Sequence, residues 1–360
     1  TVSTKDIQSP SPSISNLLGG RAAGVISLQS SGEPGQNIAD FWVRGIGTFG
    51  ANSSALVLID GLEGDLNTID PADVESFSIL KDASATAIYG ARGANGVVMI
   101  TTKKGTIGQP KIKYDGSFGI QHITKTIPMM DAYEFVKLQA ERSPKDMETT
   151  YFMNYDGKKW GLEDYRNIPQ YNWQDEIFQT GFITNNNISI TGASDKNSFY
   201  LGAGYAYEQG NIKHEKYSKV TLNISNDYKV TDNFKVGFQF NGARILPADT
   251  KSVATALRAA PVAPVYNAEY GLYTTLPGFQ KAQMNNPMVD VDLKANTTRA
   301  ENYRASGNVY GQWDFLKNFQ FKVMYSMDYA SNSSRTYTPV INVFDSSVEG
   351  NVVTLGNGKT

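Results

Sequence analysis

Residues 319–329 read FQFKVMYSMDY, with an apolar side chain at every second position. Gln320, Lys322 and Asp328 lie on the opposite side of this alternation. A period of two is the pattern of a β-strand with one apolar and one polar face. The same pattern first occurs at residues 112–121 (IKYDGSFGIQ) and returns in about six later segments. Those segments are marked by residues 188–190, 199–207, 220–230, 234–240, 305–315 and 319–329.

Two properties of these segments indicate a membrane β-barrel. None of their apolar faces carries a charge, and one Lys or Arg at mid-depth of a lipid-facing wall costs roughly 2–4 kcal/mol. We therefore expect a charge at Phe238 or Val323 to block assembly, and a charge at Gln239 to be tolerated.

The connections between the segments alternate in length. Tight turns are expected at 194–196, 231–233 and 316–318, and long loops at 122–182, 209–216 and 243–302. Outer-membrane barrels have short periplasmic turns and longer extracellular loops. Aromatic residues next to the tight turns suit an interfacial girdle: Phe199, Tyr228, Trp313, Phe315 and Phe319.

Bulk composition excludes several other classes of protein. The 360 residues carry a formal net charge of −2, so nucleic-acid binding is not expected. The chain contains no cysteine and two histidines, so neither disulfides nor a His-rich metal cluster is expected. The longest apolar runs, such as residues 55–59, are far shorter than the roughly 20 residues of a spanning helix. The sequence opens at Thr1 without an initiator Met or a signal sequence, and we interpret it as a mature or trimmed chain.

The part before the alternating segments has a different texture. Residues 1–16 are rich in Ser and Pro and are expected to form a tether. Residues 17–110 read as a compact mixed α/β domain of short strands and turns, with Asp60-Gly61 as a turn and Asp70-Pro71 as a helix start. Elements this short need an enclosing partner. We expect that partner in residues 111–360, as about seven barrel strands.

Most motifs in the chain favour a structural interpretation. Residues 45–50 (GIGTFG) match the dinucleotide-binding pattern, but a strand rather than a helix follows, so a Gly-rich turn is favoured. The acidic residues Glu63, Asp65, Asp70 and Asp73 lack EF-hand spacing. A solvated, helix-capping surface is preferred for them over a calcium site. No Ser/His/Asp set or acid/base pair stands out, and no enzyme activity is expected.

The long loops carry aromatic residues with two possible roles. They could stack on sugars or peptides, or pack their own loops; these residues are Trp160, Tyr165, Tyr171, Trp173, Tyr270 and Tyr273. A helix is expected over residues 131–142.

Residues 77–105 (FSILKDASATAIYGARGANGVVMITTKKG) resemble the plug signature of the SusC/RagA branch of TonB-dependent transporters. The stretches 17–25 (LLGGRAAGV), 43–48 (VRGIGT) and 56–61 (LVLIDG) are similar to other parts of that signature. Lys81-Asp82-Ala83 replaces the Arg-Gly-Pro usual in general TonB receptors, and this form is typical of the SusC branch. Residues 259–267 and 285–287 also look like this branch.

The resemblance implies a mixed α/β plug domain followed by antiparallel transmembrane β-barrel strands, the barrel of about 22 strands being incomplete in this chain. It implies a structural or gating role for the plug-motif residues, which are Arg44, Gly45, Asp60, Gly61, Lys81, Asp82, Tyr89, Gly90, Arg92, Gly93 and Gly96. It implies no catalytic, cofactor-binding or metal-binding residue, and it identifies no substrate-binding residue. The TonB-contacting box is expected before Thr1 and the remaining strands after Thr360.

The same resemblance implies a function and partners. The protein would import an oligosaccharide or a peptide across the outer membrane of a Gram-negative bacterium. The plug would block the barrel lumen until TonB, with its inner-membrane energising complex, pulls on it. A SusD-like surface lipoprotein would form a lid, and the bilayer would surround the barrel. Two alternatives remain open: a plugged receptor that signals to a periplasmic regulator, and a soluble β-rich protein that binds or cleaves glycans.

Overall fold

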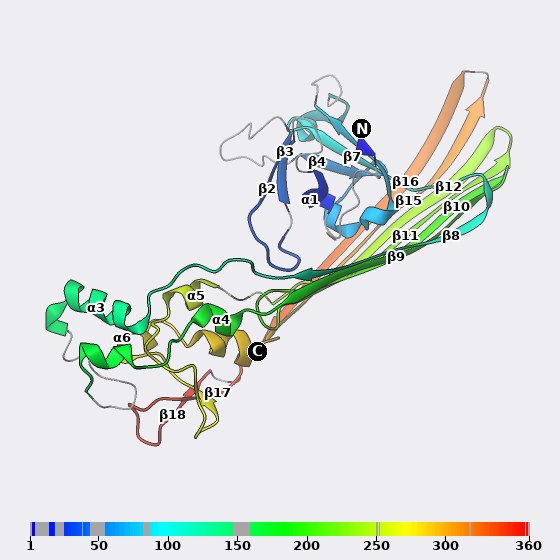
Figure 1. The fold of residues 1–360 in the computed structure, drawn as a ribbon. Helices are drawn as coiled ribbons and strands as arrows, with labels where there is room; N and C mark the ends of the chain where they lie inside the picture. The colour runs from blue at the N-terminus through cyan, green and yellow to red at the C-terminus, as the bar shows by residue number, and fades with distance from the viewer. Residues whose placement is uncertain are drawn as a thin grey trace.

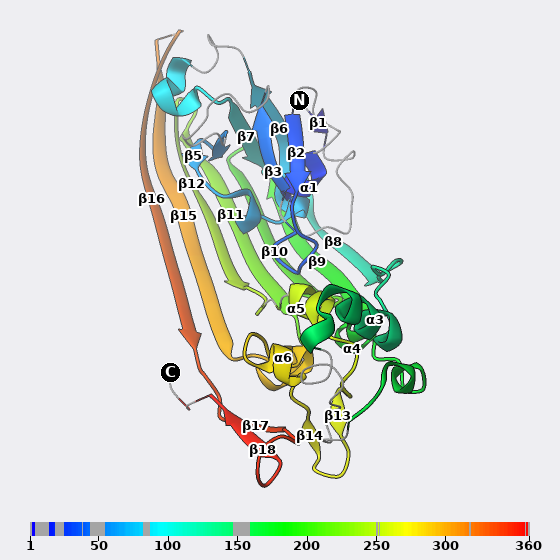
Figure 2. The ribbon, with the colours of Figure 1, turned by 90° about the vertical axis from the view of Figure 1, so that its left-hand side faces the viewer.

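A computed structural model describes residues 2–3, 14–18, 25–37, 39–43, 55–81, 87–146, 159–249, 251, 253–316, 318–356 and 358. Figure 1 shows a long curved sheet, a small mixed domain beside it, and a cluster of short helices and hairpins at one end of the sheet. Figure 2 shows the small domain in front of one face of the long sheet.

The long sheet has seven antiparallel strands in the order β16-β15-β12-β11-β10-β9-β8. Each strand pairs with its neighbour along the chain, as expected from the alternating segments. The strands are β8 (Gly108–Gln121), β9 (Gly181–Ala193), β10 (Asn197–Gln209), β11 (Lys216–Thr231), β12 (Phe234–Leu246), β15 (Thr298–Phe315) and β16 (Phe319–Thr336). We call this sheet the wall.

Tight turns join the strands at one end of the wall, and longer connections join them at the other (Figure 1). Ser194 N donates to Asn197 O over 2.7 Å in the turn between β9 and β10. Leu316 adopts a φ of 51° in the turn between β15 and β16. The connection from β10 to β11 covers only residues 210–215 and is tied to residue 178 by an isolated bridge between Phe178 and Ile212.

The two faces of the wall differ as the alternation predicts. On the outward face, Ile112 is 72% exposed and Phe321 is 57% exposed. On the inward face Asn187 and Lys219 are buried, and they donate to Asp73 and to Ile69 O of the small domain. An exposed apolar face on a sheet this long suits lipid rather than water, so the wall disfavours the soluble alternative.

The small domain is built on a five-stranded sheet in the order β1-β6-β7-β4-β5. Its strands are β1 (Val2–Ser3), β4 (Leu56–Ile59), β5 (Leu62–Glu63), β6 (Val74–Leu80) and β7 (Val97–Thr102), and β4 and β7 run parallel. The helix α1 (Ile14–Leu18) and the hairpin of β2 (Val25–Gln29) and β3 (Ala39–Val43) complete it. Its core contains Ile14, Leu66, Phe77, Val98 and Ile100.

The tether expected over residues 1–16 is wrong at the positions that the structure describes. Val2 and Ser3 pair with Phe77 and Ser76 of β6, where the edge of the sheet offers free backbone groups. Ile14 opens α1 and is completely buried in the small domain. The described residues of this segment are therefore part of the small domain.

The loop cluster contains the expected helix and several shorter elements. The helix α3 (Ala132–Arg142) starts at Asp131, whose side chain accepts from Glu134 N in a capping box. The other elements are α4 (Trp173–Ile177), α5 (Val253–Arg258), α6 (Gly278–Lys281), β13 (Tyr266–Asn267), β14 (Leu272–Tyr273), β17 (Ile341–Phe344) and β18 (Val352–Leu355). In the described part of the chain, no helix combines the length and apolarity needed to cross a membrane.

Several loop aromatics pack within their own cluster. Trp173 is buried and its Nε1 donates to Ala260 O over 3.1 Å. Tyr165 is buried against Trp160, with ring centroids 5.5 Å apart. Of the two roles considered for these residues, packing is the one observed for Trp160, Tyr165 and Trp173.

Candidate functional site: the polar interface between the small domain and the wall

Two carboxylates of the small domain point into the wall. Asp70 caps a 3₁₀ turn at Pro71–Asp73, where its Oδ1 accepts from Ala72 N over 2.7 Å. Asp70 and Asp73 are 1% and 0% exposed. The capping role was expected, but the solvated surface was wrong for these two residues because the wall covers them.

Three neighbouring wall strands hold this pair. Tyr200 Oη, on β10, donates to Asp73 Oδ1 over 2.7 Å, and Asn187 Nδ2, on β9, donates to the same oxygen over 3.2 Å. Lys219, on β11, is buried and its Nζ donates to Ile69 O over 3.3 Å. The pair is thus recognised by donors and by one buried ammonium group.

Glycines in β10 make room for the two carboxylates. A Cβ at Gly202 would lie 2.9 Å from Asp73 Cγ, and a Cβ at Gly204 would lie 3.1 Å from Asp70 Cγ. The first distance is closer than real Cβ atoms approach their neighbours. A side chain at Gly202 would therefore displace the carboxylate.

Burial dominates the electrostatics of the pair. It raises the pKa of Asp73 to about 6, with a further contribution from the negative charge of Asp70, against the opposing hydrogen bonds from Tyr200 and Asn187. Burial also raises the pKa of Asp70, against the opposing charge of Lys219. Ionised carboxylates at this site are therefore less favourable than in water.

Unpaired polar atoms surround the pair. Asp73 Oδ2, Asn187 Oδ1, Thr221 Oγ1 and Asn223 Nδ2 are buried and have no hydrogen-bond partner among the residues that the structure describes. Each unpaired buried group costs about 1–3 kcal/mol. The interface is polar and incompletely satisfied, unlike the apolar core of the small domain.

A second contact joins the small domain to the loop end of the wall. Glu208, on β10, is 1% exposed and accepts from Asn37 Nδ2 at 3.2 Å and from Gln121 Nε2 at 3.0 Å. Next to it, Gly35 has a φ of 71°, and a Cβ there would lie 2.6 Å from Tyr217 Cε2. The loop before β3 thus fits closely against β10 and β11.

Several plug-motif residues shape the small domain itself. Asp60 and Gly61 form a turn with φ values of 49° and 88°, and the Asp60 carboxylate accepts from Thr102 N at 2.9 Å and from Thr102 Oγ1 at 2.7 Å. Burial raises the pKa of Asp60. Gly96, with a φ of 93°, lies where a Cβ would be 2.8 Å from Val43 Cβ.

The remaining plug-motif residues are spread over the same domain. Arg92 forms an exposed ion pair with Glu63 at 2.7 Å, and Gly93 O accepts from Gly96 N. Tyr89 Oη lies 3.9 Å from Met99 Sδ, Gly90 has a φ of 61° and Lys81 is half-buried. Arg44, Gly45, Asp82 and the motif at 45–50 lie outside the described residues. The gating role of this set stays a prediction.

Sequence reasoning missed the wall residues that join the two parts. Tyr200, Lys219 and Glu208 belong to no motif. The available signal was their inward parity on β10 and β11, which places Tyr200 and Glu208 on the polar face opposite Leu201 and Tyr207.

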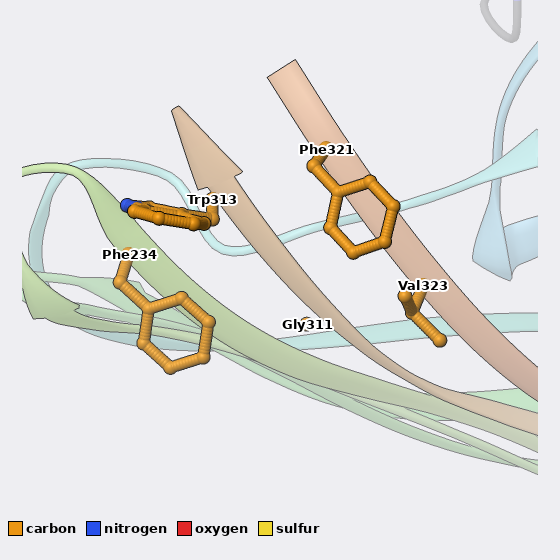
Figure 3. A pocket seen from close by; sticks show the side chains of 5 residues that line it. All are labelled: Phe234, Gly311, Trp313, Phe321 and Val323. Atoms are coloured by element: carbon orange, nitrogen blue, oxygen red, sulfur yellow. The ribbon is translucent and has the colours of Figure 1, made fainter. Parts of the chain in front are cut away.

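The described residues hold no group of three or more His, Cys, Asp or Glu side chains that could bind a metal. Figure 3 shows a shallow pocket on the outward face of the wall, lined by Phe234, Gly311, Trp313, Phe321 and Val323. Its lining is apolar, as expected for a lipid-facing surface.

Known proteins share this arrangement of a small domain and a wall. The sequence model of the TonB-dependent Receptor Plug Domain matches residues 1–97. TonB-dependent receptor P3 of Formosa agariphila is 33% identical over 92% of this chain and 32% of its own length. TonB-dependent receptor SusC of Bacteroides thetaiotaomicron is 28% identical over 89% of this chain and 34% of its own length. The chain spans about a third of the length of these relatives.

Solved structures agree with the sequence comparison. The RagAB peptide importer in its closed-closed state matches with a TM-score of 0.74 and 26% identity, over 92% of this chain and 41% of that one. The siderophore receptor PirA of Pseudomonas aeruginosa matches with a TM-score of 0.51 and 14% identity, over 95% of this chain and 44% of that one, which shows a shared fold only.

A plug domain docked on the polar face of an antiparallel wall defines the class of plugged outer-membrane β-barrels. The chain belongs to the SusC/RagA type of TonB-dependent transporters, with the small domain as the plug and the wall as barrel strands. This confirms the fold class and the resemblance stated from the sequence. The family is one of transporters and receptors rather than enzymes.

Proposed function

We propose that the protein imports an oligosaccharide or a peptide across the outer membrane of a Gram-negative bacterium, with the plug as the gate. TonB and its inner-membrane complex would supply the energy, and a SusD-like lipoprotein would capture cargo at the loop cluster. The likeness to TonB-dependent receptor SusC and to the RagAB peptide importer supports these partners, and the second likeness supports a peptide as cargo.

The observation that carries the proposal is the polar docking of the plug on the wall. Asp73 is held by Tyr200 and Asn187, and Glu208 holds Asn37, all through hydrogen bonds. A typical hydrogen bond contributes only about 0.5–1.5 kcal/mol net, because water replaces it when the partners separate. A plug held in this way can leave the wall without exposing a large apolar surface.

The direction of the chain is consistent with a pull from the periplasm. Strand β1 lies toward the end of the tight turns, opposite the loop cluster (Figure 1). It occupies the edge of the plug sheet and pairs through two residues only. A force applied to the N-terminal side would meet this weak edge before the central strands.

A reversible crosslink tests the proposal, and the chain offers a clean background because it has no cysteine. In the variant Gly202→Cys/Asp73→Cys, the two Cβ atoms would lie within about 4.4 Å, which suits a disulfide, since the Gly202 Cβ position is 2.9 Å from Asp73 Cγ. Uptake of labelled peptides and oligosaccharides would be measured in cells that express the intact protein. We expect the oxidised double variant to lose uptake and a reductant to restore it.

The two single-cysteine variants are the matched controls, since each perturbs the same contact without a crosslink. Uptake that persists with the crosslink fully formed would show that this face of the plug stays on the wall during transport. Uptake that is independent of TonB would remove the proposed energy source.

A further inference from the structure

We propose that the outward face of the wall binds the phosphate group of an outer-leaflet lipid through Arg244, Arg299 and Arg335. This inference rests on the proposed function, because it requires the wall to cross the outer membrane. The three arginines lie on β12, β15 and β16 at the loop end.

Strand register places these arginines on the lipid side. Arg244 is the partner of Tyr303, and Arg299 is the partner of Arg335. Directly paired residues share a face, and successive positions alternate. Arg299, Tyr303 and Arg335 therefore have the same parity as the exposed apolar residues Val309 and Phe321.

Their height follows from the length of the apolar band. On β16 the outward residues are apolar or aromatic from Phe319 to Tyr329. About 11 residues at roughly 3.3 Å each, tilted by about 45°, span about 25 Å, the height of the lipid-facing band of such barrels. At the same scale Arg244, which is level with Ser331 through Tyr303, lies about 5 Å beyond Tyr329, and Arg299 and Arg335 lie about 14 Å beyond it. The cluster therefore extends outward from the level of the lipid headgroups.

One carboxylate bridges two of the three arginines without neutralising the cluster. Glu301 Oε1 lies 3.0 Å from Arg244 Nη2 and 3.6 Å from Arg299 Nη2, and Tyr303 Oη donates to Glu301 Oε2 over 2.9 Å. Arg244 also stacks over the Tyr303 ring at 5.7 Å. Three guanidinium groups against one carboxylate leave two positive charges, and guanidinium forks match phosphate oxygens well.

An apolar groove runs directly below the cluster. It is lined by Leu222, Phe240, Gly242, Arg244, Ala305 and Tyr329 from four strands. Gly242 and Ala305 are register partners, and their small side chains form the floor between larger neighbours. A groove of this composition suits an acyl chain whose headgroup lies at Arg244. At the opposite end of the same strands, the outward residues Phe234, Trp313, Phe315 and Phe319 are aromatic.

Lipid titration of the intact protein, purified in detergent and measured by native mass spectrometry, tests the site. The probes are phosphatidic acid, diacylglycerol with the same acyl chains, and inorganic phosphate. We expect phosphatidic acid to bind and the triple variant Arg244→Gln/Arg299→Gln/Arg335→Gln to bind it about 100-fold more weakly. Glu301→Gln, which removes the competing carboxylate, should bind it roughly five-fold more tightly.

The triple variant Lys125→Gln/Lys137→Gln/Arg142→Gln is the matched control, because it removes the same charge from exposed positions of the loop cluster. Its binding should match that of the parent. Equal binding of phosphatidic acid by both triple variants would overturn the proposal, as would equal binding of diacylglycerol by the parent. Displacement of the lipid by equimolar inorganic phosphate would assign the arginines to a free anion instead.

The outcomes also separate this inference from the proposed function. If the protein fractionates outside the outer membrane, the proposed function fails. If it fractionates with that membrane and supports uptake, yet shows no phosphate-dependent lipid binding, only the lipid site fails. Heat-modifiable migration on gels confirms that each variant has a folded barrel, and Glu301→Gln tests the site even if the arginine variant does not fold.

Discussion

The substitution Gly202→Ala should loosen the plug from the wall while leaving the barrel folded. The added Cβ would lie 2.9 Å from Asp73 Cγ and 3.0 Å from Tyr200 Cε1, so one of these groups must move. Movement of Asp73 breaks its hydrogen bonds from Tyr200 and Asn187. A typical hydrogen bond contributes about 0.5–1.5 kcal/mol net, so docking should weaken by roughly 1–3 kcal/mol if both break.

Pulse proteolysis of the plug in increasing urea would measure this loss, since the folded barrel resists both agents. Gly311→Ala is the matched control, because its Cβ would face outward at an ordinary 3.7 Å from Phe234 Cε2. That variant should change docking by less than about 0.5 kcal/mol.

A double-mutant cycle makes the reasoning refutable. Asp73→Ala removes the group that the new methyl meets. In that background, Gly202→Ala should cost less than about 0.5 kcal/mol, so the two substitutions should be strongly non-additive. Additive effects, or a Gly202→Ala plug as protected as the parent, would refute the close fit between the glycine and the carboxylate.

Three further predictions concern pH, the lipid face and the plug turns. The pKa of Asp73 is about 6 when docked against an ordinary 3.8. The docked state therefore binds more protons between these values, and docking should weaken by about 3 kcal/mol as the pH rises from 4 to above 6. Urea midpoints of plug unfolding at pH 4.5 and 7.5 measure this change. The substitution Asp73→Asn should remove most of the pH dependence. Phe238→Lys should reduce the yield of folded barrel, because a lysine on the lipid-facing side costs roughly 2–4 kcal/mol. The inward variant Gln320→Lys should fold normally, since Gln320 Nε2 lies 2.9 Å from the carboxylate of Asp314. Equal yields of the two variants would contradict the assignment of faces. Gly96→Ala should destabilise the plug more than Gly90→Ala, since both have positive φ but only the Gly96 methyl would meet Val43, and thermal unfolding of the two variants would decide.

The wall was predictable because its signal is local. A period of two in residues such as Phe319 to Tyr329 reports which side of each strand meets lipid. The strands extend beyond the apolar pattern, as in β15, which begins at Thr298. There the outward residues leave the lipid and lose their apolar character, while the backbone ladder continues.

The interface was not predictable because its contacts join distant parts of the chain. Tyr200 lies 127 residues from Asp73, and Glu208 lies 171 residues from Asn37. Asp70 carries a capping signature that is the same on a solvated turn and on a buried one. Gln239 is 9% exposed and bonded to Asn308 of the neighbouring strand, which makes Gln320 the better site for an inward charge.

The position of the anchoring residues along the chain has a consequence for biogenesis. Asp73 is held by β9 and β10 and Asn37 by Glu208 of β10, to which Gln121 of β8 also donates; these strands directly follow the plug. Each wall strand pairs with its sequence neighbour, so the wall can grow one hairpin at a time from β8 onward. The plug therefore finds its seat once β8 to β11 have formed, while the sheet is still open at its far edge. The seat of the plug on these strands can thus be complete while later strands of the wall are still to pair.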